Sequence, residues 1–171
     1  AGNMVTLLIN SELGLNDIET AEKIKKYPLA KVESIFHIRH EDGAVQFFKE
    51  PLDPKLFARV IIVEENTLTP IDSDIPLEKI RIVRRTAKEK VFVFNSVRAL
   101  ETVSPTGNIR DIPFVVLVGG SSLDFEIPQM VTDALSHYKI VAGRGNIRGQ
   151  EGPRNAVATG LVLDYIRSGN Y

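Results

Sequence analysis

A short apolar run ends in two glycines and two serines at residues 119–122, and these residue types in this order suit a nucleotide. Glycine has no Cβ, so Gly119 and Gly120 would let a flat base or a ribose approach the main chain closely. A helix that follows such a turn would present free backbone amides and the positive end of its dipole. On this segment alone, the alternative of a tight strand-to-helix turn without a ligand stays open.

A second candidate is the set Glu22, Lys25 and Lys26, whose spacings of three and four residues place them on one face of a helix. A carboxylate and two ammonium groups there could clamp a purine and its ribose, with the lysine stems lying against the ring. The alternative is an ordinary solvated face with a weak ion pair.

The glycine- and arginine-rich segment GRGNIRG at residues 143–149 has the spacing G-x-G-x-x-x-G. This spacing differs from the dinucleotide fingerprint, and the segment does not lead directly from a strand into a helix, so we reject a Rossmann site. Its arginines could contact phosphate or a partner surface. Arg154, at the start of the expected last helix, is better placed to meet a nucleotide, because guanidinium stacks on bases and forks onto oxygens.

Other polar residues form no convincing active site. His37 and His40 lie three apart on an expected strand and would face opposite sides, which argues against a shared metal. Asp72 and Asp74 fit a loop and a helix cap better than an acid–base pair. The metalloprotease, α/β-hydrolase and P-loop motifs are absent from the sequence. The sequence therefore predicts no catalytic residue and no metal ligand.

The composition is that of a soluble globular protein, with 43% hydrophobic and 25% charged residues. A net charge of -1 gives no global field that would attract nucleic acid or an anionic membrane. No apolar run reaches the roughly 18 residues that a membrane span needs. The absence of cysteine excludes disulfides and thiolate metal sites and fits a reducing cytosol.

The first half of the chain must position the charged face. The apolar spacing and a capping Asn16 or Asp17 predict a helix over residues 16–27 that ends before Pro28 and buries Ile18, Ala21 and Ile24. A hairpin is expected next, with strands at 32–39 and 44–48 and a turn at 41–43 that uses a glycine. A β-branched strand follows at 59–63.

The second half must position the glycine pair. Apolar residues at steps of three to four predict a long helix over 77–103, with Arg84, Arg85, Lys88 and Lys90 mostly on its solvated side. The run at 114–118 predicts a strand buried on both faces. We expect a helix at 127–138, a short strand at 139–142, and a last helix at 154–168 opened by Pro153, which together make an α/β pattern.

Taken together, these pieces resemble the second half of the actin-like ATPases, which include sugar kinases and heat-shock chaperones of the seventy-kilodalton class. VVLVGGSS at residues 115–122 resembles their adenosine motif, and Glu22, Lys25 and Lys26 resemble the Glu-x-x-Lys-basic face that lies over the adenine. Within that superfamily the sequence is most similar to the large subunit of diol and glycerol dehydratase reactivases. The most specific stretches are residues 27–43, 104–129 and 141–161.

The resemblance implies an α/β fold: the C-terminal half of an actin-like, ribonuclease H-like ATPase domain, with a mixed sheet flanked by helices and with an upper-lobe helix and hairpin. Residues 1–171 are then one fragment, in which about 1–103 hold the upper-lobe elements and the long helix, and about 104–171 the adenosine-motif subdomain. We expect the first half of the domain to be missing, with Ala1-Gly2 as the last remnant of its second phosphate loop.

The resemblance also implies the site. Glu22, Lys25 and Lys26 would bind the adenine and ribose of ATP or ADP, and Arg154 would form the far wall of the base pocket. The glycine-turn contacts would come from Gly119, Gly120 and Ser121. The phosphate loops and the ligands of Mg²⁺ would lie outside this fragment. The full-length protein would then be a slow ATPase, and the isolated fragment would bind nucleotide weakly and leave it intact.

The function that the resemblance implies is that of an ATP-dependent molecular chaperone. It would reactivate an inactivated coenzyme-B12-dependent dehydratase by releasing its damaged cobalamin. Its partners would be the reactivase small subunit and the dehydratase, with no nucleic acid or membrane, and it would be cytoplasmic, in association with a bacterial microcompartment. Two alternatives remain: a non-catalytic module that docks a partner subunit, and a small-molecule kinase of the same fold.

Overall fold

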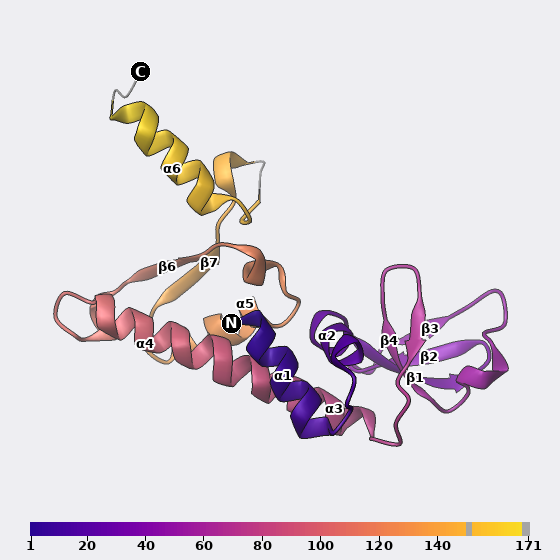
Figure 1. The fold of residues 1–171 in the computed structure, drawn as a ribbon. Helices are drawn as coiled ribbons and strands as arrows, with labels where there is room; N and C mark the ends of the chain where they lie inside the picture. Colours follow the sequence, from indigo (N-terminus) through magenta and orange to yellow (C-terminus); the bar gives the residue numbers. More distant parts are fainter. Residues whose placement is uncertain (150–151, 169–171) are drawn as a thin grey trace. The chain divides into compact units, whose positions relative to one another are not determined.

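The computed structural model describes residues 1–149 and 152–168, apart from the side chain of Arg148. The chain forms two compact units, residues 1–88 and 89–171, which divide inside the long helical segment (Figure 1). The helical segment ends at Val103, and the expected division of the chain near that residue stays a prediction. Across the described ranges, no helix is both long enough and apolar enough to cross a bilayer.

Two helices at the start of the first unit pack side by side, α1 (Gly2–Leu13) and α2 (Ile18–Lys26). The Asp17 side chain caps α2 by accepting from the backbone amides of Glu19 and Thr20. The expected helix before Pro28 is confirmed, and Ala21 and Ile24 are buried as expected. Ile18 is an exception, since it stays 50% exposed.

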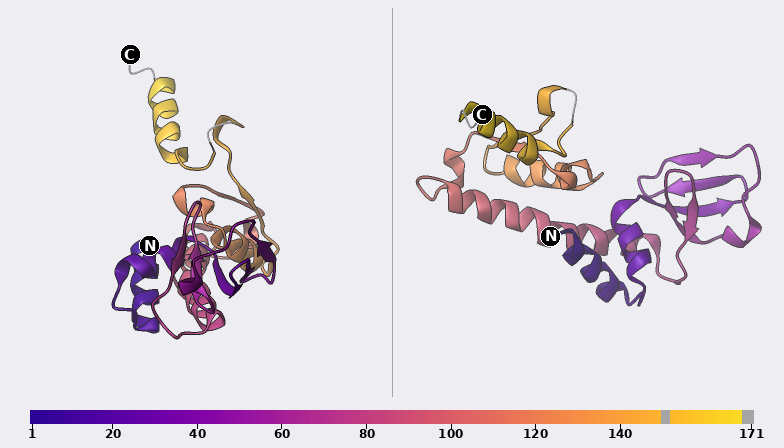
Figure 2. Two further views of the ribbon diagram at one scale, coloured as in Figure 1. Left: turned by 90° about the vertical axis from the view of Figure 1, so that its right-hand side faces the viewer. Right: turned by 45° about the horizontal axis from the view of Figure 1, so that its top comes forward.

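The first unit also holds an antiparallel five-stranded sheet (Figure 2). The pairing of its strands gives the order β3-β2-β1-β4-β5. Its strands are β1 (Leu29–Ser34), β2 (His37–His40), β3 (Val45–Phe47), β4 (Val60–Val63) and β5 (Leu68–Pro70). The β2–β3 turn confirms the expected hairpin, with Gly43 at φ 91°. The sequence did not predict β5, because a proline inside a short run argues against a strand unless it lies at a sheet edge, as here.

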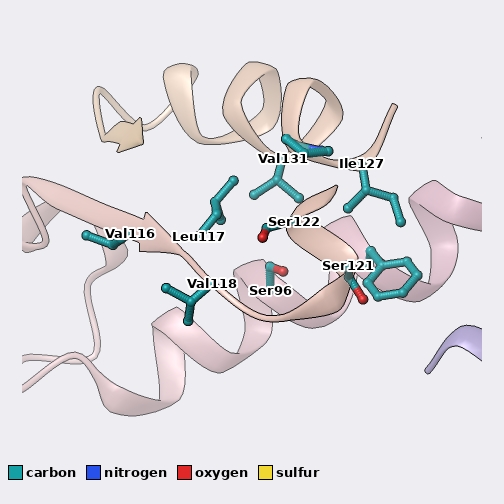
Figure 3. Close-up of a pocket in the computed structure, with 10 residues that line it drawn as sticks. Ser96, Val116, Leu117, Val118, Ser121, Ser122, Ile127 and Val131 are labelled. Carbon is teal, nitrogen blue, oxygen red and sulfur yellow. The ribbon is translucent and has the colours of Figure 1, made fainter. Parts of the chain in front are cut away.

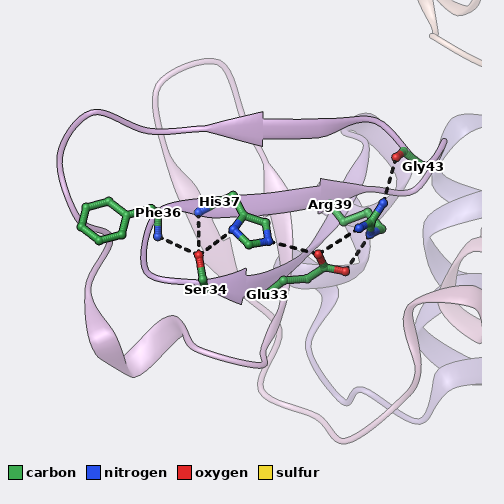
Figure 4. A network of polar contacts seen from close by, with 6 residues as sticks. All are labelled: Glu33, Ser34, Phe36, His37, Arg39 and Gly43. Atoms are coloured by element: carbon green, nitrogen blue, oxygen red, sulfur yellow. Dashed lines mark hydrogen bonds and ion pairs between the residues drawn. The ribbon is translucent and has the colours of Figure 1, made fainter.

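The expectation of one strand over residues 32–39 is wrong. The chain turns at Ile35 and Phe36, so that β1 and β2 become two antiparallel neighbours. The Ser34 hydroxyl accounts for the turn, because it accepts from the backbone amides of Phe36 at 3.1 Å and His37 at 3.2 Å (Figure 4). Glu33 joins the two strands through Arg39, with 2.7 Å between Nε and Oε1.

The long helix expected over 77–103 is confirmed, with a π-helical turn inside it. It consists of α3 (Leu77–Lys88), the π-helical η2 (Glu89–Val93) and α4 (Phe94–Val103). The expectation that Arg84 and Lys88 are solvated is wrong, because both are fully buried. Arg84 is buried because its guanidinium meets Glu41, with 2.6 Å between Nη2 and Oε1.

The second unit pairs β6 (Phe114–Leu117) in parallel with β7 (Val141–Arg144), connected through α5 (Ile127–Ser136). Its core joins these elements to the long helix through Val93, Ile109, Ile127, Val131, Leu135 and Ile140. The expected strands and helix are thus found, but the prediction that β6 is buried on both faces is wrong. Val115 and Leu117 pack on this core, whereas Phe114 and Val116 are 58% and 46% exposed on the other face.

The last helix, α6 (Ala156–Arg167), follows the glycine-rich loop and begins two residues later than expected. Pro153 precedes its N-cap, Asn155, rather than standing at its first position. None of its residues is buried in the described part of the chain, and several large apolar side chains are exposed along it: Val157, Leu161, Val162, Tyr165 and Ile166.

Candidate functional site

The glycine turn directly follows β6 and has a backbone that requires glycine at its first position. Gly119 lies at φ 86° and ψ 176°, a region that side chains with a Cβ essentially do not enter. Its amide donates to the carbonyl of Pro153 at 2.7 Å. This bond holds the segment that carries Arg154 against the glycine turn, so the structure brings together two parts of the expected site that are distant in the sequence.

The second glycine leaves open space above the main chain. Gly120 begins a short 3-10 turn, η4 (Gly120–Leu123), and a Cβ placed on it would meet no heavy atom within 4 Å. The neighbouring Ser121 is exposed, as a ligand contact requires. Ser122 has a different role that the sequence analysis missed: its buried hydroxyl donates to the carbonyl of Gly119 at 2.6 Å and holds the turn.

A pocket of about 270 Å³ lies beside this turn (Figure 3). Ser121 and Ser122 line it from the turn, and Ser96 lines it from α4. Its remaining walls are mostly apolar and are contributed by Phe92, Val116, Leu117, Val118, Ile127, Pro128 and Val131. An apolar pocket with a few hydroxyls suits an uncharged group rather than a phosphate.

The expectation of free amides at the start of the following helix is wrong. The Oδ1 atom of Asp124 accepts from the amide of Glu126 at 2.9 Å and from that of Ile127 at 3.1 Å. A carboxylate therefore already occupies the N-terminus of α5, where an anion would otherwise bind. The glycine turn thus offers bare backbone and hydroxyls but no prepared phosphate site.

The arginines near this turn differ in how they are placed. Arg154 is exposed next to Pro153, which is buried. Arg144 is exposed at the end of β7, and the side chain of Arg148 lies outside the described residues, as do Gln150 and Glu151. Arg154 directly follows the residue that is bonded to the glycine turn, and its contact with a nucleotide stays a prediction.

On α2, the three expected residues form one charged cluster. The Glu22 carboxylate receives Lys25 at 2.5 Å on Oε2 and Lys26 at 2.9 Å on Oε1. The Lys25 side chain is only 13% exposed, whereas that of Lys26 is 56% exposed. Lys26 therefore presents its head to solvent, and Lys25 is mainly an internal partner of Glu22.

Two residues of α1, Thr6 and Gly2, complete the cluster, and no signal in the sequence points to either. Lys25 donates to the Thr6 hydroxyl at 2.9 Å and to the carbonyl of Gly2 at 3.3 Å, and Thr6 donates to Glu22. Burial raises the pKa of Glu22, but the hydrogen bonds from Lys25, Thr6 and Lys26 outweigh it and hold the pKa at about 2. Glu22 is therefore an anion at neutral pH.

A hollow of about 560 Å³ lies on the face formed by α1 and α2. Glu22 and Thr6 line it together with Asn3, Leu7, Ile18 and Glu19. The half-exposed Ile18 and Leu7 thus give apolar surface next to a carboxylate. This combination suits a ligand with both a flat apolar face and hydroxyl groups.

The expected site residues thus gather in two groups. Glu22, Lys25 and Lys26 lie together in the first unit, and the glycine turn lies with the Arg154 segment in the second. Contact of either group with a purine stays a prediction. No three acidic, histidine or cysteine side chains of the described residues converge on a possible metal position. His37 and His40 have different partners, Ser34 and Glu33 for the first and Gln46 for the second.

Comparison with known proteins identifies relatives along nearly the whole chain. The sequence is 70% identical over 165 residues to the diol dehydratase-reactivating factor large subunit of Klebsiella michiganensis and to the propanediol dehydratase-reactivating factor large subunit of Salmonella typhimurium. Each alignment covers 96% of this chain and 27% of the relative. The chain therefore spans about a quarter of the length of these relatives.

Solved structures of similar proteins also match this chain. A glycerol dehydratase reactivase superposes with a TM-score of 0.90 at 71% identity, and a diol dehydratase-reactivating factor in nucleotide-free form with a TM-score of 0.89 at 70% identity. Each match covers 96% of this chain and 27% of the solved one. The family model described as the diol dehydratase reactivase ATPase-like domain matches residues 1–165. The chain, a mixed α/β structure, belongs to the diol dehydratase reactivase ATPase-like domain family.

Proposed function

We propose that this chain supplies the adenine and ribose side of a nucleotide site in the large subunit of a dehydratase reactivase. The observation that carries the proposal is the bare backbone at Gly120, beside the exposed Ser121 and a largely apolar pocket. A base or ribose could approach this main chain closely, because a Cβ placed on Gly120 would meet no heavy atom within 4 Å other than those of its chain neighbours. The family's description as ATPase-like supports a nucleotide as the ligand.

The charged cluster of α2 fits the sugar. An ionised carboxylate accepts hydrogen bonds only, and Glu22 is therefore a suitable acceptor for a ribose hydroxyl. That bond would fall on Oε1, which among the described residues binds Lys26 alone, because Oε2 already accepts from Thr6 and Lys25. Lys26 has an exposed head and an aliphatic stem that can lie along a purine ring. The sequence predicts that Lys25 binds the adenine and ribose, but its hydrogen bonds go to Thr6, Glu22 and Gly2. We therefore assign Lys25 the role of holding Glu22 in place.

A chain that carries only the adenine and ribose side of the site fits the C-terminal half of an actin-like ATPase domain. In this proposal Mg²⁺ and the phosphates are held by parts of the full-length protein outside this chain. The isolated chain would then bind ATP weakly and leave it unhydrolysed, since phosphoryl transfer depends on positioning and neutralising the γ-phosphate.

For the full-length protein we propose an ATP-dependent chaperone that releases damaged cobalamin from an inactivated diol or glycerol dehydratase. The names of the relatives support a dehydratase as the client and a second, smaller subunit as a partner. We place this activity in the cytoplasm, in association with a bacterial microcompartment.

The test is Gly120→Ala in the full-length large subunit, followed by calorimetric titration with ADP. The space above Gly120 accommodates a methyl group in the unliganded protein, so the variant should fold normally. It should bind ADP at least about tenfold more weakly, because the methyl group occupies the space where a base would approach. Gly160→Ala, which also has open space around it, is the matched control and should bind as the unaltered protein does. Unchanged affinity in Gly120→Ala contradicts the proposal.

The exposed apolar side chains of α6 favour a second candidate function, a non-catalytic docking module. The two candidates differ in what Arg154→Ala and Ser121→Leu should do in the full-length protein. Both variants should lower the affinity for nucleotide if the glycine turn and Arg154 bind nucleotide. Both should leave that affinity unchanged if the chain only docks a partner.

A further inference from the structure

The hydroxyl of Thr6 lies between the two charged groups of the α2 cluster. It accepts a hydrogen bond from the Lys25 ammonium at 2.9 Å and lies 2.5 Å from the Oε2 atom of Glu22. Thr6 itself is only 4% exposed. A hydroxyl has one proton to donate and two lone pairs to accept with, so it can satisfy an anion and a cation at once.

Lys25 reinforces this arrangement from the same side. Its three N–H groups have three acceptors within reach: Thr6, the Glu22 carboxylate at 2.5 Å and the carbonyl of Gly2 at 3.3 Å. With its side chain only 13% exposed, Lys25 has little access to a ligand. The Oε2 atom of Glu22 is thus fixed from α1 by Thr6 and from α2 by Lys25.

We propose that Thr6 is a positioning residue for the nucleotide site: its hydroxyl holds Oε2 of Glu22, so that the other oxygen, Oε1, is oriented to accept a ribose hydroxyl. This inference rests on the proposed function and adds to it a residue that does not itself touch the ligand. Threonine suits the role because its β-branched side chain has few rotamers, and the α1 backbone therefore determines where the hydroxyl lies. A carboxylate held in place in advance loses less entropy when the ligand binds.

The experiment replaces Thr6 by valine, alanine and serine in the full-length large subunit and measures ADP affinity by calorimetry. Valine keeps the shape and removes the hydroxyl, and affinity should fall about tenfold, because Glu22 must then be ordered when the ligand binds. Alanine should give a similar loss, and serine should restore affinity to within about threefold of the original. Thr102→Val, which removes a hydroxyl from an exposed helical position, is the control and should bind normally.

A second readout separates positioning from a general effect on the fold. In Thr6→Val the pKa of the Glu22 carboxyl, followed by carbon-13 NMR, should rise from about 2 towards its ordinary 4.5, because one hydrogen bond to the charged form is lost. Thr6→Ser should keep it low. An affinity loss without any change in this pKa overturns the positioning role.

The variant Glu22→Gln separates failure of the proposed role of Glu22 from failure of the proposed role of Thr6. Unchanged ADP affinity in Glu22→Gln overturns the assignment of Glu22 to the ribose and with it the role of Thr6, whereas Gly120→Ala tests the nucleotide site at the glycine turn separately. Weakened binding in Glu22→Gln together with normal binding in Thr6→Val leaves the nucleotide site in place and overturns only the role of Thr6.

Discussion

The backbone amide of Gly119 donates to the carbonyl of Pro153 at 2.7 Å, and this bond fastens the end of the glycine-rich loop to the turn after β6. It places Arg154 next to the glycine turn within one compact unit. The extended backbone with positive φ at Gly119 is therefore part of how the candidate site is assembled.

The first prediction concerns this backbone. Gly119→Ala should lower the free energy of unfolding by about 1–3 kcal/mol, because alanine is strained at this φ and ψ. Gly120→Ala should change it by less than about 0.5 kcal/mol, since its Cβ meets open space. Urea unfolding of the purified chain measures both values. Equal losses in the two variants would mean that the backbone at Gly119 is not specially restricted.

The sequence predicted the elements of this part of the chain because each has a local signal. The apolar run of β6, the proline in the first turn of α5 and the glycine pair all act within a few residues. The bond between Gly119 and Pro153 has no such signal, since it joins main-chain groups of two segments that only the fold brings together. The burial of β6 on both faces was wrong because a continuous apolar run does not reveal how many neighbours a strand has.

The second prediction concerns Gly145, which follows β7. A Cβ there would lie 2.9 Å from the Cγ1 atom of Val118 and 3.0 Å from that of Val116. Gly145→Ala should therefore destabilise the chain by about 1–3 kcal/mol through overpacking. Gly143→Ala, with open space around it, is the control and should have little effect.

The same crowding predicts a rescue. Val118→Ala should recover part of the stability lost in Gly145→Ala, because it removes the nearer of the two methyl groups that the new Cβ meets. A double-mutant cycle on thermal unfolding measures this coupling. Simple additivity of the two changes would contradict the steric explanation.

The third prediction concerns the buried pair of Arg84 and Glu41. Glu41 accepts from Arg84 at 2.6 Å and, through its other oxygen, from the amide of Leu29 at 2.8 Å. Arg84→Met should cost about 3–5 kcal/mol, since it leaves a largely buried carboxylate without its guanidinium. Arg81→Met removes an exposed pair with Glu78 at 3.4 Å and should cost at most about 1 kcal/mol. Comparable unfolding midpoints for the two variants would show that the buried pair is not special.

Arg84 also illustrates why the sequence misplaced some charges. Its position on α3 belongs to the polar side of the helical pattern, and helical periodicity cannot show that Glu41, from the hairpin turn, reaches it. Thr6 was missed for a similar reason: a threonine in an apolar helix gives no sign that α2 packs against it. Glu22, Lys25 and Lys26 were found because their spacing within one helix makes them neighbours in any fold.

The fourth prediction concerns pH. Glu22 has a folded-state pKa of about 2 against an ordinary value of 4.5, so its hydrogen bonds stabilise the fold fully above pH 4.5. That contribution is lost as the pH falls from 4.5 through about 2. Glu22→Gln should flatten the pH dependence of the unfolding free energy in this window, as measured by urea unfolding at several pH values. An unchanged slope would show that Glu22 titrates normally.

Nucleotide contact by the α2 cluster or by the glycine turn is the central claim of the proposed function. The most direct measurement is photolabelling of the full-length large subunit with 8-azido-ADP, followed by peptide mapping with and without excess ADP. We predict labels that ADP suppresses in peptides containing residues 22–26 or 119–122. ADP-protected labels confined to other parts of the protein would contradict the account.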